Sequence, residues 1–458
     1  MRAARFTALL LLLVALHPAA AQTQDFGQIV LYLEKIAAPA SETMLSFDLF
    51  TLQSDDAAAN LISLAARVSS DELERQQILL AEADVPPILY RELSFAVLVK
   101  AAPLEGMDSA LFSYRQEINI PLDLVLQAGS SQAVFLQWEQ TVTADTTQPL
   151  KSAFYRVQKR LPPLTARAYV SNESSGNLSI LDLQSGETVG CLRVGQGPRG
   201  MAVSRQSRLL YVANSQSHTI SVLDLQTQQL RAEINLDFGD EPQALCLARD
   251  ERKLFSANHG SNSVTVLDAE RFVLLSRVSV GTAPLDIAAD PAGDSIYVAN
   301  SLSDDISVLN SRSDELAYTL TTGAYPAAIE FEKSQRVAYV ANLNSGSITQ
   351  INTHSMSVSG EWNLNRGVRD IVSDSFSGTL YCALENLDVV SIFKPALNIE
   401  IAQIPVGAKP QQAAFDPQSR LLYVCCAESD NLFAINRVSG RVERVIAAGQ
   451  SPYMVIFP

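Results

Sequence analysis

A four-residue pattern that recurs at a nearly constant interval constrains this chain more than any other feature. Three copies are the tetrad Tyr-Val-Ala-Asn itself, and four more are variants of it. Neighbouring copies begin 42 or 44 residues apart. A fixed period over seven copies indicates a repeat architecture. The copies begin at Tyr169, Tyr211, Phe255, Tyr297, Tyr339, Tyr381 and Tyr423.

Each tetrad is followed by the same succession of short segments. A polar turn leads into an alternating segment such as residues 220–224, and a second turn leads into a segment that ends near a glycine such as Gly281. A proline and a short apolar run come next, as in residues 284–289. Period-two alternation between turns predicts β-strands. Four short antiparallel strands in each repeat predict a blade of a β-propeller.

The tetrad, the strand that ends in Asp or Asn, and the Gly-x-x-Pro linker together resemble the YVTN-type β-propeller repeat family. The resemblance covers about residues 165–458. It implies a propeller fold for this part of the chain, a scaffold that serves many functions. WD-repeat propellers have a similar period, but their Trp-Asp signature does not occur in this sequence.

The two ends of the repeat region complement one another. Residues 452–457 form a proline-led strand without the rest of its blade, whereas the first repeat, from Arg167, lacks such a strand. We therefore predict that the C-terminal strand completes the first blade, so that no sheet edge stays open at the seam. The predicted fold class is all-β: a seven-bladed propeller of residues 166–458, preceded by a small β-rich domain.

The chain before the propeller lacks the repeat. Residues 1–21 have the charged start, apolar segment and small-residue cleavage site of a secretory signal peptide. Their apolar run is short for a membrane span, which favours export over anchorage. Alternating segments in residues 22–145 predict a small β-rich domain, for which a sandwich is one arrangement, although residues 70–83 also suit a short helix. Residues 146–165 are expected to be the linker.

The charge of the chain excludes one class of partner. The formal net charge of −15 disfavours nucleic-acid binding, because an acidic surface repels phosphates. No stretch after the first 21 residues is long and apolar enough to predict a membrane span. We expect a secreted or periplasmic protein.

Cysteine and histidine give no catalytic motif. The five cysteines fall on predicted propeller strands without a C-x-x-C-H haem motif, so we expect buried structural thiols, with one disulfide or a reactive thiol in the closing blade as the alternative. His218 and His259 follow the tetrads of adjacent blades, but zinc would need further ligands, and we expect exposed turn residues. No catalytic base or nucleophile is identified.

Alignment of the proline-led strands singles out three carboxylates. The third residue after the proline position is apolar in all seven strands and should pack between blades, whereas Asp286, Glu330 and Asp370 lie beside that position on three consecutive blades. We predict that they converge at a channel mouth and bind a cation such as calcium, which takes six to eight oxygen ligands. Some seven-bladed propeller lactonases have an acidic central site to which this set is similar. Alternatively, each carboxylate caps a turn, accepts hydrogen bonds from the backbone of a neighbouring blade, or pairs with Arg199 or Arg369.

Two functions follow from these features. The loops before each proline and after each tetrad should share one face. The polar side chains of that face suit a protein, peptide or glycan partner, which predicts a binding or scaffold protein. The alternative is an extracytoplasmic metal-dependent hydrolase, similar to a lactonase, that uses the acidic set. We favour the binding protein. The predicted partner face consists of Arg199, Gln243, Asp286, Arg369, Gln411 and Tyr453.

Overall fold

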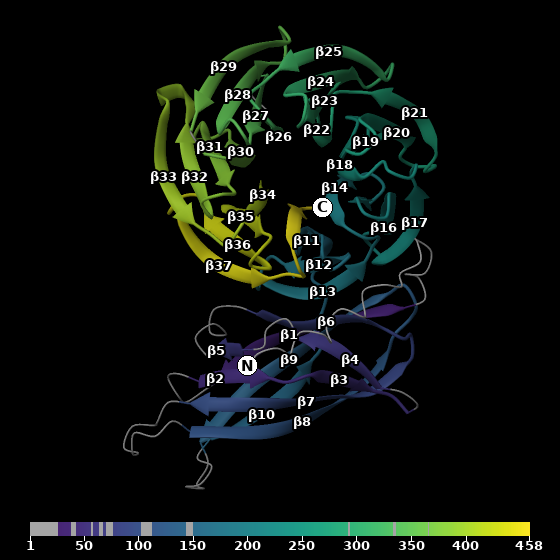
Figure 1. Ribbon diagram of the computed structural model, residues 1–458, viewed down its shortest axis with the longest axis vertical. Helices are drawn as coiled ribbons and strands as arrows, with labels where there is room; N and C mark the ends of the chain where they lie inside the picture. Colours follow the sequence, from purple (N-terminus) through teal and green to yellow (C-terminus); the bar gives the residue numbers. More distant parts are fainter. Residues whose placement is uncertain are drawn as a thin grey trace, which may run out of the picture.

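The structure is a computed structural model that describes residues 26–37, 43–55, 58–63, 67–69, 77–101, 112–142, 150–291, 294–332, 336–364 and 366–458. The predicted signal peptide lies outside these residues. The described chain is all-β, with two single 3₁₀ turns, Leu164–Ala166 and Pro395–Leu397. No helix within the described ranges is long and apolar enough to cross a membrane. Figure 1 shows a ring of blades with a separate layer of strands beside it.

The N-terminal layer is a ten-stranded sheet of described residues, in the order β10-β9-β1-β6-β4-β3-β7-β2-β5, with β8 paired to β7. All its pairs are antiparallel except β1 with β9, which is parallel. The strands are β1 (Gly27–Ala37), β2 (Thr43–Phe47), β3 (Phe50–Gln53), β4 (Ala58–Ser63), β5 (Arg67–Ser69), β6 (Ile78–Val85), β7 (Leu89–Ala101), β8 (Phe112–Val125), β9 (Ser131–Val142) and β10 (Leu150–Val157).

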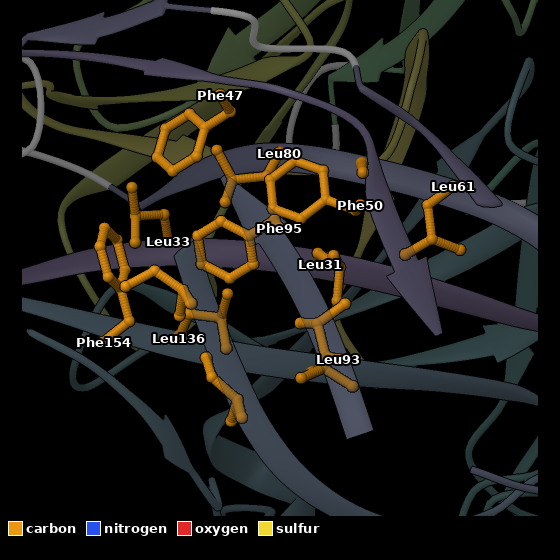
Figure 2. Packing of buried hydrophobic residues seen from close by; sticks show 14 of the residues in the cluster. Leu31, Leu33, Phe47, Phe50, Leu61, Leu80, Leu93, Phe95, Leu136 and Phe154 are labelled. Carbon is orange, nitrogen blue, oxygen red and sulfur yellow. The ribbon is translucent and has the colours of Figure 1, made fainter. Parts of the chain in front are cut away.

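This sheet curls so that its two ends pack face to face around one core. Phe95 of β7 lies edge-on to Phe154 of β10, with ring centroids 5.3 Å apart, although the two strands are far apart in the sheet order. Phe47 and Phe50 complete the aromatic cluster, and Figure 2 shows these rings turned toward one another. The arrangement is therefore sandwich-like, as one reading of the sequence expects.

Two details of the sequence prediction need correction. The linker was predicted to begin at residue 146, but β10 pairs with β9 along its whole length, so the N-terminal unit extends to Val157. Residues 78–83 of the segment that also suited a helix belong to β6, because β6 is held between β1 and β4. Residues 70–76 of that segment lie outside the described ranges.

The described residues from Arg167 onward form seven four-stranded antiparallel sheets, the blades. Blades 2 to 7 each follow the chain from the innermost to the outermost strand. Blade 1 comprises β11 (Arg167–Asn172), β12 (Asn177–Asp182), β13 (Glu187–Arg193) and β38 (Pro452–Ile456); blade 2, β14 (Pro198–Ser204), β15 (Leu209–Asn214), β16 (Thr219–Asp224) and β17 (Gln229–Asn235); blade 3, β18 (Pro242–Leu247), β19 (Lys253–Asn258), β20 (Ser263–Asp268) and β21 (Leu274–Ser279); blade 4, β22 (Pro284–Ala289), β23 (Ser295–Asn300), β24 (Asp305–Asn310) and β25 (Glu315–Thr321); blade 5, β26 (Pro326–Glu332), β27 (Val337–Asn342), β28 (Ser347–Asn352) and β29 (Ser357–Asn363); blade 6, β30 (Val368–Asp374), β31 (Thr379–Leu384), β32 (Val389–Lys394) and β33 (Ile399–Pro405); blade 7, β34 (Pro410–Phe415), β35 (Leu421–Cys426), β36 (Asn431–Asn436) and β37 (Arg441–Ala447).

The closure predicted from the sequence is confirmed. The C-terminal strand β38 pairs antiparallel with β11 and becomes the innermost strand of blade 1. Figure 1 shows the chain end near the centre of the ring. The apolar residues three positions after the prolines are all buried, from Met201 to Val455. The seven blades are thus held together by the pairing of β38 with β11 and by apolar packing between neighbouring blades.

The hydrogen bonds of the tetrad asparagine explain why this residue recurs. Asn214 sits at the end of β15 and is fully buried, and its Nδ2 donates to Thr219 Oγ1 (3.0 Å) and Ser221 Oγ (2.9 Å) on β16. Asn172, Asn258, Asn300 and Asn342 make the equivalent pair of bonds in their blades. The Nδ2 group of the amide therefore fixes the turn between the second and third strands.

The linker glycine is required by that asparagine. A Cβ at Gly281 would lie 2.7 Å from Asn300 Nδ2, and the same clash occurs at Gly195 with Asn214 Nδ2. Only glycine lets the linker backbone approach the buried amide so closely. The glycine and asparagine of the repeat are thus one packing unit.

The N-terminal sheet and the propeller share a buried interface. The face of β1 that points away from the N-terminal core places Val30 and Tyr32 in one cluster with Cys191 of β13 and Ala447 of β37. Polar bonds cross it: Gln28 Nε2 donates to Ser175 O (2.7 Å), and Lys159 Nζ donates to both Glu34 and Glu187 (2.9 Å each). The N-terminal sheet therefore covers the outer edge of blade 1, and none of its described strands lies on the opposite side of the ring (Figure 1).

Candidate binding site at the end of the propeller channel

The residue directly after each blade's proline, or after Val368 in blade 6, defines what we call the rim positions. Each innermost strand begins with a register shift next to this position, a local irregularity that re-aims side chains. Five of the seven rim side chains are polar. The rim positions are Arg199, Gln243, Leu285, Ala327, Arg369, Gln411 and Tyr453.

The rim side chain of Tyr453 lies between two arginines. The guanidinium carbons of Arg199 and Arg369 lie 5.1 and 5.6 Å from the centroid of its ring. Arg369 Nη2 also donates to the Tyr453 hydroxyl at 2.9 Å. Cation–π attraction and this hydrogen bond hold three residues from blades 2, 6 and 1 in a fixed arrangement across the axis.

Both arginines have further polar partners. Arg199 donates to Glu173 Oε1 (2.6 Å) and to Gln243 Oε1, and Arg369 Nε donates to Gln411 Oε1 (3.0 Å). Burial alone would lower the pKa of Arg369, but Tyr453, Glu385 and Asp370 outweigh it and the pKa is raised, so this side chain stays charged. Five of the six residues of the predicted partner face therefore form one connected network.

A pocket of about 270 Å³ opens beside this network. Its polar side comes from blades 1, 2, 6 and 7 and includes Arg199, Tyr453, Arg369, Gln411 and Lys409. Its other side comes from blades 4 and 5 and consists of Leu285, Tyr325 and Leu343. Since the walls are contributed by nearly the whole ring, the pocket exists only when the propeller is closed.

One donor in this pocket lacks a partner. Gln411 is 8% exposed, its Oε1 is taken by Arg369, and no described residue bonds its Nε2. An unpaired buried amide donor is unfavourable in a folded protein. It therefore marks a position where an acceptor from outside the chain would be stabilised.

Asp286, the sixth residue of the predicted partner face, does not belong to it. It lies one position beyond the rim, and its carboxylate accepts hydrogen bonds from Ile287 N and from Ile329 N of blade 5 (2.8 Å each). Leu285 lines the pocket in its place. Because adjacent residues of a strand point to opposite sides, a shift of one position moves a side chain from the rim to the contact between blades.

The other two carboxylates of the acidic set also bond the next blade. Glu330 Oε1 accepts from Ser373 N (3.0 Å) and Ser373 Oγ (2.8 Å), and Asp370 Oδ2 accepts from Ala413 N (2.7 Å). This is one of the alternatives that the sequence left open. Within the described ranges, no group of three or more His, Cys, Asp or Glu side chains is placed to hold a metal ion.

The three carboxylates nevertheless affect one another. Desolvation raises the pKa of Asp370 to about 8, with smaller contributions from the negative charges of Asp286 and Glu330. Desolvation also raises the pKa of Asp286, against its two backbone hydrogen bonds and the charge of Arg369. The acidic set is therefore electrostatically coupled.

Four side chains two positions after the proline position act in the same way, and we call them the seam positions: Asp286, Asp370, Gln412 and Met454. Gln412 Oε1 accepts from Val455 N (3.0 Å), and Met454 Sδ accepts from Met201 N (3.2 Å). Each side chain bonds the backbone of the following blade. The seam positions thus connect innermost strands that do not pair with one another.

The cysteines and histidines carry no chemistry in this site. All five cysteines, which lie within the described residues, are free thiols; Cys425 and Cys426 belong to different clusters, and burial raises the pKa of both. His218 Nδ1 accepts from Glu241 N (3.2 Å), and His259 lies 3.5 Å from the Glu241 carboxylate. Both histidines lie in turns, as predicted, but they are partly buried and not exposed.

With this geometry in view, the chain can be compared with known proteins. A family model described as "Lactonase, 7-bladed beta-propeller" matches residues 179–326. The chain is a seven-bladed β-propeller. The matched segment is less than half of the chain and ends within the innermost strand of blade 5, before Glu330 and Asp370.

Solved structures agree with this propeller in fold. Hydrazine synthase from Kuenenia stuttgartiensis aligns with a TM-score of 0.55 and 17% identity, over 61% of this chain and 97% of that one. Dihydro-heme d1 dehydrogenase NirN in complex with DHE aligns with a TM-score of 0.50 and 15% identity, over 68% of each chain. The comparison with curated proteins gave no match. At such identities the likeness concerns the fold alone.

Several residues of the propeller site were missed by the sequence prediction. Glu173 and Glu385 directly follow the tetrads of blades 1 and 6, so their positions in the repeat carried a usable signal. Leu285, Tyr325 and Leu343 resemble ordinary apolar residues of a repeat, and nothing local distinguishes them. An alignment of the residue directly after the proline in all blades would have selected Leu285 instead of Asp286.

Proposed function

We propose that this protein is an exported binding protein that holds its partner on the rim face of the propeller, at the pocket beside Tyr453. A protein, a peptide or a glycan is the expected class of partner. The observation that supports the proposal best is the connected network of five rim residues around a pocket with an unpaired buried donor. Residues fixed in advance lose little entropy on binding, which favours recognition.

The position of these side chains also supports recognition. They lie on the innermost strands, each of which pairs with the second strand of its blade. Sites built on strands hold their geometry better than sites on loops. The N-terminal sheet packs against blade 1 and is a second module in this proposal.

A direct test uses the full chain and two matched variants. Tyr453→Ala removes the ring between the two arginines, whereas Tyr318→Ala removes a half-exposed ring on the outer strand of blade 4. Partners captured from envelope or culture-medium fractions should be retained by wild type and Tyr318→Ala and lost by Tyr453→Ala. Retention by all three proteins would contradict the proposal.

The second candidate is a metal-dependent hydrolase similar to a lactonase. The family match and the coupling of Asp286, Glu330 and Asp370 favour it. Against it, each carboxylate already accepts a hydrogen bond from the next blade. Calorimetry with calcium separates the candidates: stoichiometric binding that Asp370→Asn abolishes, together with lactone hydrolysis, supports the enzyme, and the absence of both excludes it.

Export itself rests on residues 1–21. Removing them should leave the protein inside the producing cell, whereas the full chain should be found outside the cytoplasm and should lack these residues. Fractionation followed by mass spectrometry of the N-terminus measures both.

A further inference from the structure

The two sides of the pocket beside Tyr453 differ in chemistry. One side offers hydrogen-bond donors from Arg369, Gln411 and Tyr453, and the other offers the apolar surfaces of Leu285 and Leu343. A ligand that satisfies both sides needs acceptor oxygens at one end and an apolar body at the other.

Gln411 determines which kind of polar group fits. Arg369 Nε donates to Gln411 Oε1 at 3.0 Å, and this bond fixes the amide so that Nε2 is the end without a partner. The side chain is more than nine-tenths buried, so little water reaches the donor. A ligand oxygen would replace an unsatisfied contact instead of competing with an existing one.

The neighbouring groups are donors as well. The Tyr453 hydroxyl accepts from Arg369 Nη2, which leaves its own proton for a ligand acceptor. Arg369 is a buried guanidinium whose pKa is raised, and guanidinium and amide N–H groups bind carboxylate oxygens well. A carboxylate is acceptor-only, so it matches this set better than a hydroxyl or an amide, which also brings donors.

The charges and the volume of the pocket narrow the class of ligand further. Three cations and three carboxylates line the pocket and lie close in pairs: Arg199 with Glu173, Arg369 with Glu385 (3.6 Å) and Lys409 with Glu428 (3.5 Å). On a chain with a net charge of −15, a pocket with such balanced charges does not suit a polyanion, so the ligand carries few charges. Its volume of about 270 Å³ lies below the range of pockets for drug-sized ligands, about 300–1,000 Å³.

We propose that this pocket binds a monocarboxylate with a small apolar body, either as a free acid or as the C-terminal residue of a peptide. The carboxylate bonds Gln411 Nε2, the Tyr453 hydroxyl and Arg369, and the apolar body packs on Leu285 and Leu343. The proposal rests on the proposed binding function and names the ligand chemistry of the same site.

The test is calorimetry on the full chain with matched pairs of probes. N-acetyl-leucine and N-acetyl-leucinamide differ only in the carboxylate, and the peptide acetyl-Gly-Gly-Leu and its amide present the same choice at a chain end. Each acid should bind at least about tenfold more tightly than its amide, because a charged hydrogen bond is lost in the amide. Tighter binding of the peptide acid assigns a chain end as the source, and tighter binding of N-acetyl-leucine assigns a free acid.

A conservative variant locates the bound carboxylate. Gln411→Glu keeps an acceptor for Arg369 Nε, removes the free donor and adds a negative charge. It should weaken binding of the acids by about tenfold or more and leave the amides unchanged. Gln229→Glu makes the same change on the exposed outer strand of blade 2 and should have no effect. The thermal midpoints of the variants establish that they fold.

Other outcomes separate this inference from the proposed function. Equal binding of acids and amides, failure of all four probes to bind at millimolar concentration, or unchanged acid binding in Gln411→Glu overturns the carboxylate proposal. If Tyr453→Ala still abolishes capture of a partner in those cases, the binding function stands and the partner is recognised by another chemistry. If that variant has no effect either, both proposals fail.

Discussion

Where an innermost strand carries both, the rim residue and the seam residue are neighbours in sequence but have different roles. Arg369 turns to the end of the axis, bonding Gln411 and Tyr453 around the pocket, whereas Asp370 turns to blade 7 and bonds Ala413 N. Both are polar, both are largely enclosed, and they are neighbours in sequence. The difference comes from strand geometry, since consecutive side chains point to opposite sides.

The comparison shows how one strand supplies both stability and recognition. The four seam side chains accept N–H groups of the following blade through a carboxylate, an amide oxygen or a thioether. Rim side chains vary from arginine to alanine. Substitutions at seam positions should therefore change stability, and substitutions at rim positions should change binding.

The largest effect is expected at a seam position when the pH is varied. The native pKa of Asp370 is about 8, above the unfolded value near 3.9, so the native state holds an extra proton between these pH values. The stability contributed by Asp370 is therefore complete below about pH 4 and is lost as the pH rises through about 8. Asp370→Asn, which cannot ionise, should lose less stability over this window, by up to about 1.4 kcal/mol per pH unit.

Denaturant unfolding of both proteins from pH 4.5 to 9 measures this difference. Burial also raises the pKa values of Glu82 and Asp430, and these two groups contribute a slope of the same sign. Their contribution cancels when the two curves are subtracted. Parallel curves would show that Asp370 ionises normally, and the seam position would then carry no electrostatic cost.

The second-largest effect on stability is expected when a seam side chain loses its hydrogen bonds, and two variants distinguish these bonds from its charge. Asp286→Ala leaves Ile287 N and Ile329 N without their acceptor, which should destabilise the protein by about 1–3 kcal/mol. Asp286→Asn retains an acceptor oxygen and should recover most of this loss. Chemical denaturation measures both, and equal stability of the two variants would mean that the bonds between blades contribute little.

The repeat determines how much of the division between rim and seam positions can be predicted from the sequence. The seven blades and their closure follow from the tetrads and from β38, because the same local pattern recurs and leaves one strand unpaired at each end. Most rim residues follow for the same reason. Asp286 was assigned to the rim because it was chosen for its charge, whereas strand alternation depends on position.

The other features of the structure are not encoded by a repeated sequence pattern. The N-terminal sheet has no repeat, so neither the pairing of β10 nor the strand β6 could be fixed from local alternation. The interface around Tyr32 and Cys191 joins residues far apart in sequence, and each looks like an ordinary core residue. The raised pKa of Asp370 also depends on burial and on two carboxylates from other blades, which no local pattern encodes.

A smaller effect is expected where the seam acceptor is sulfur. Met201 N donates to Met454 Sδ at 3.2 Å, and a thioether is a weak acceptor. Met454→Leu keeps the apolar volume and should cost no more than about 1 kcal/mol, below the loss expected for Asp286→Ala. Thermal unfolding compares the two variants. A larger loss in the leucine variant than in Asp286→Ala would contradict the expectation that the strength of the hydrogen bond decides what a seam position tolerates.

The smallest effect on stability is expected at a rim position. Arg199 is partly exposed, as is its partner Glu173, and exposed ion pairs contribute about 0–1 kcal/mol. Arg199→Lys keeps the charge but loses the planar group that lies over Tyr453 and bonds both Glu173 and Gln243. The free energy of unfolding should therefore change by less than about 1 kcal/mol, while partner capture at the rim falls. If unfolding shifted as much as in Asp286→Ala, rim and seam would be one structural network, and the separation of recognition from stability on these strands would be wrong.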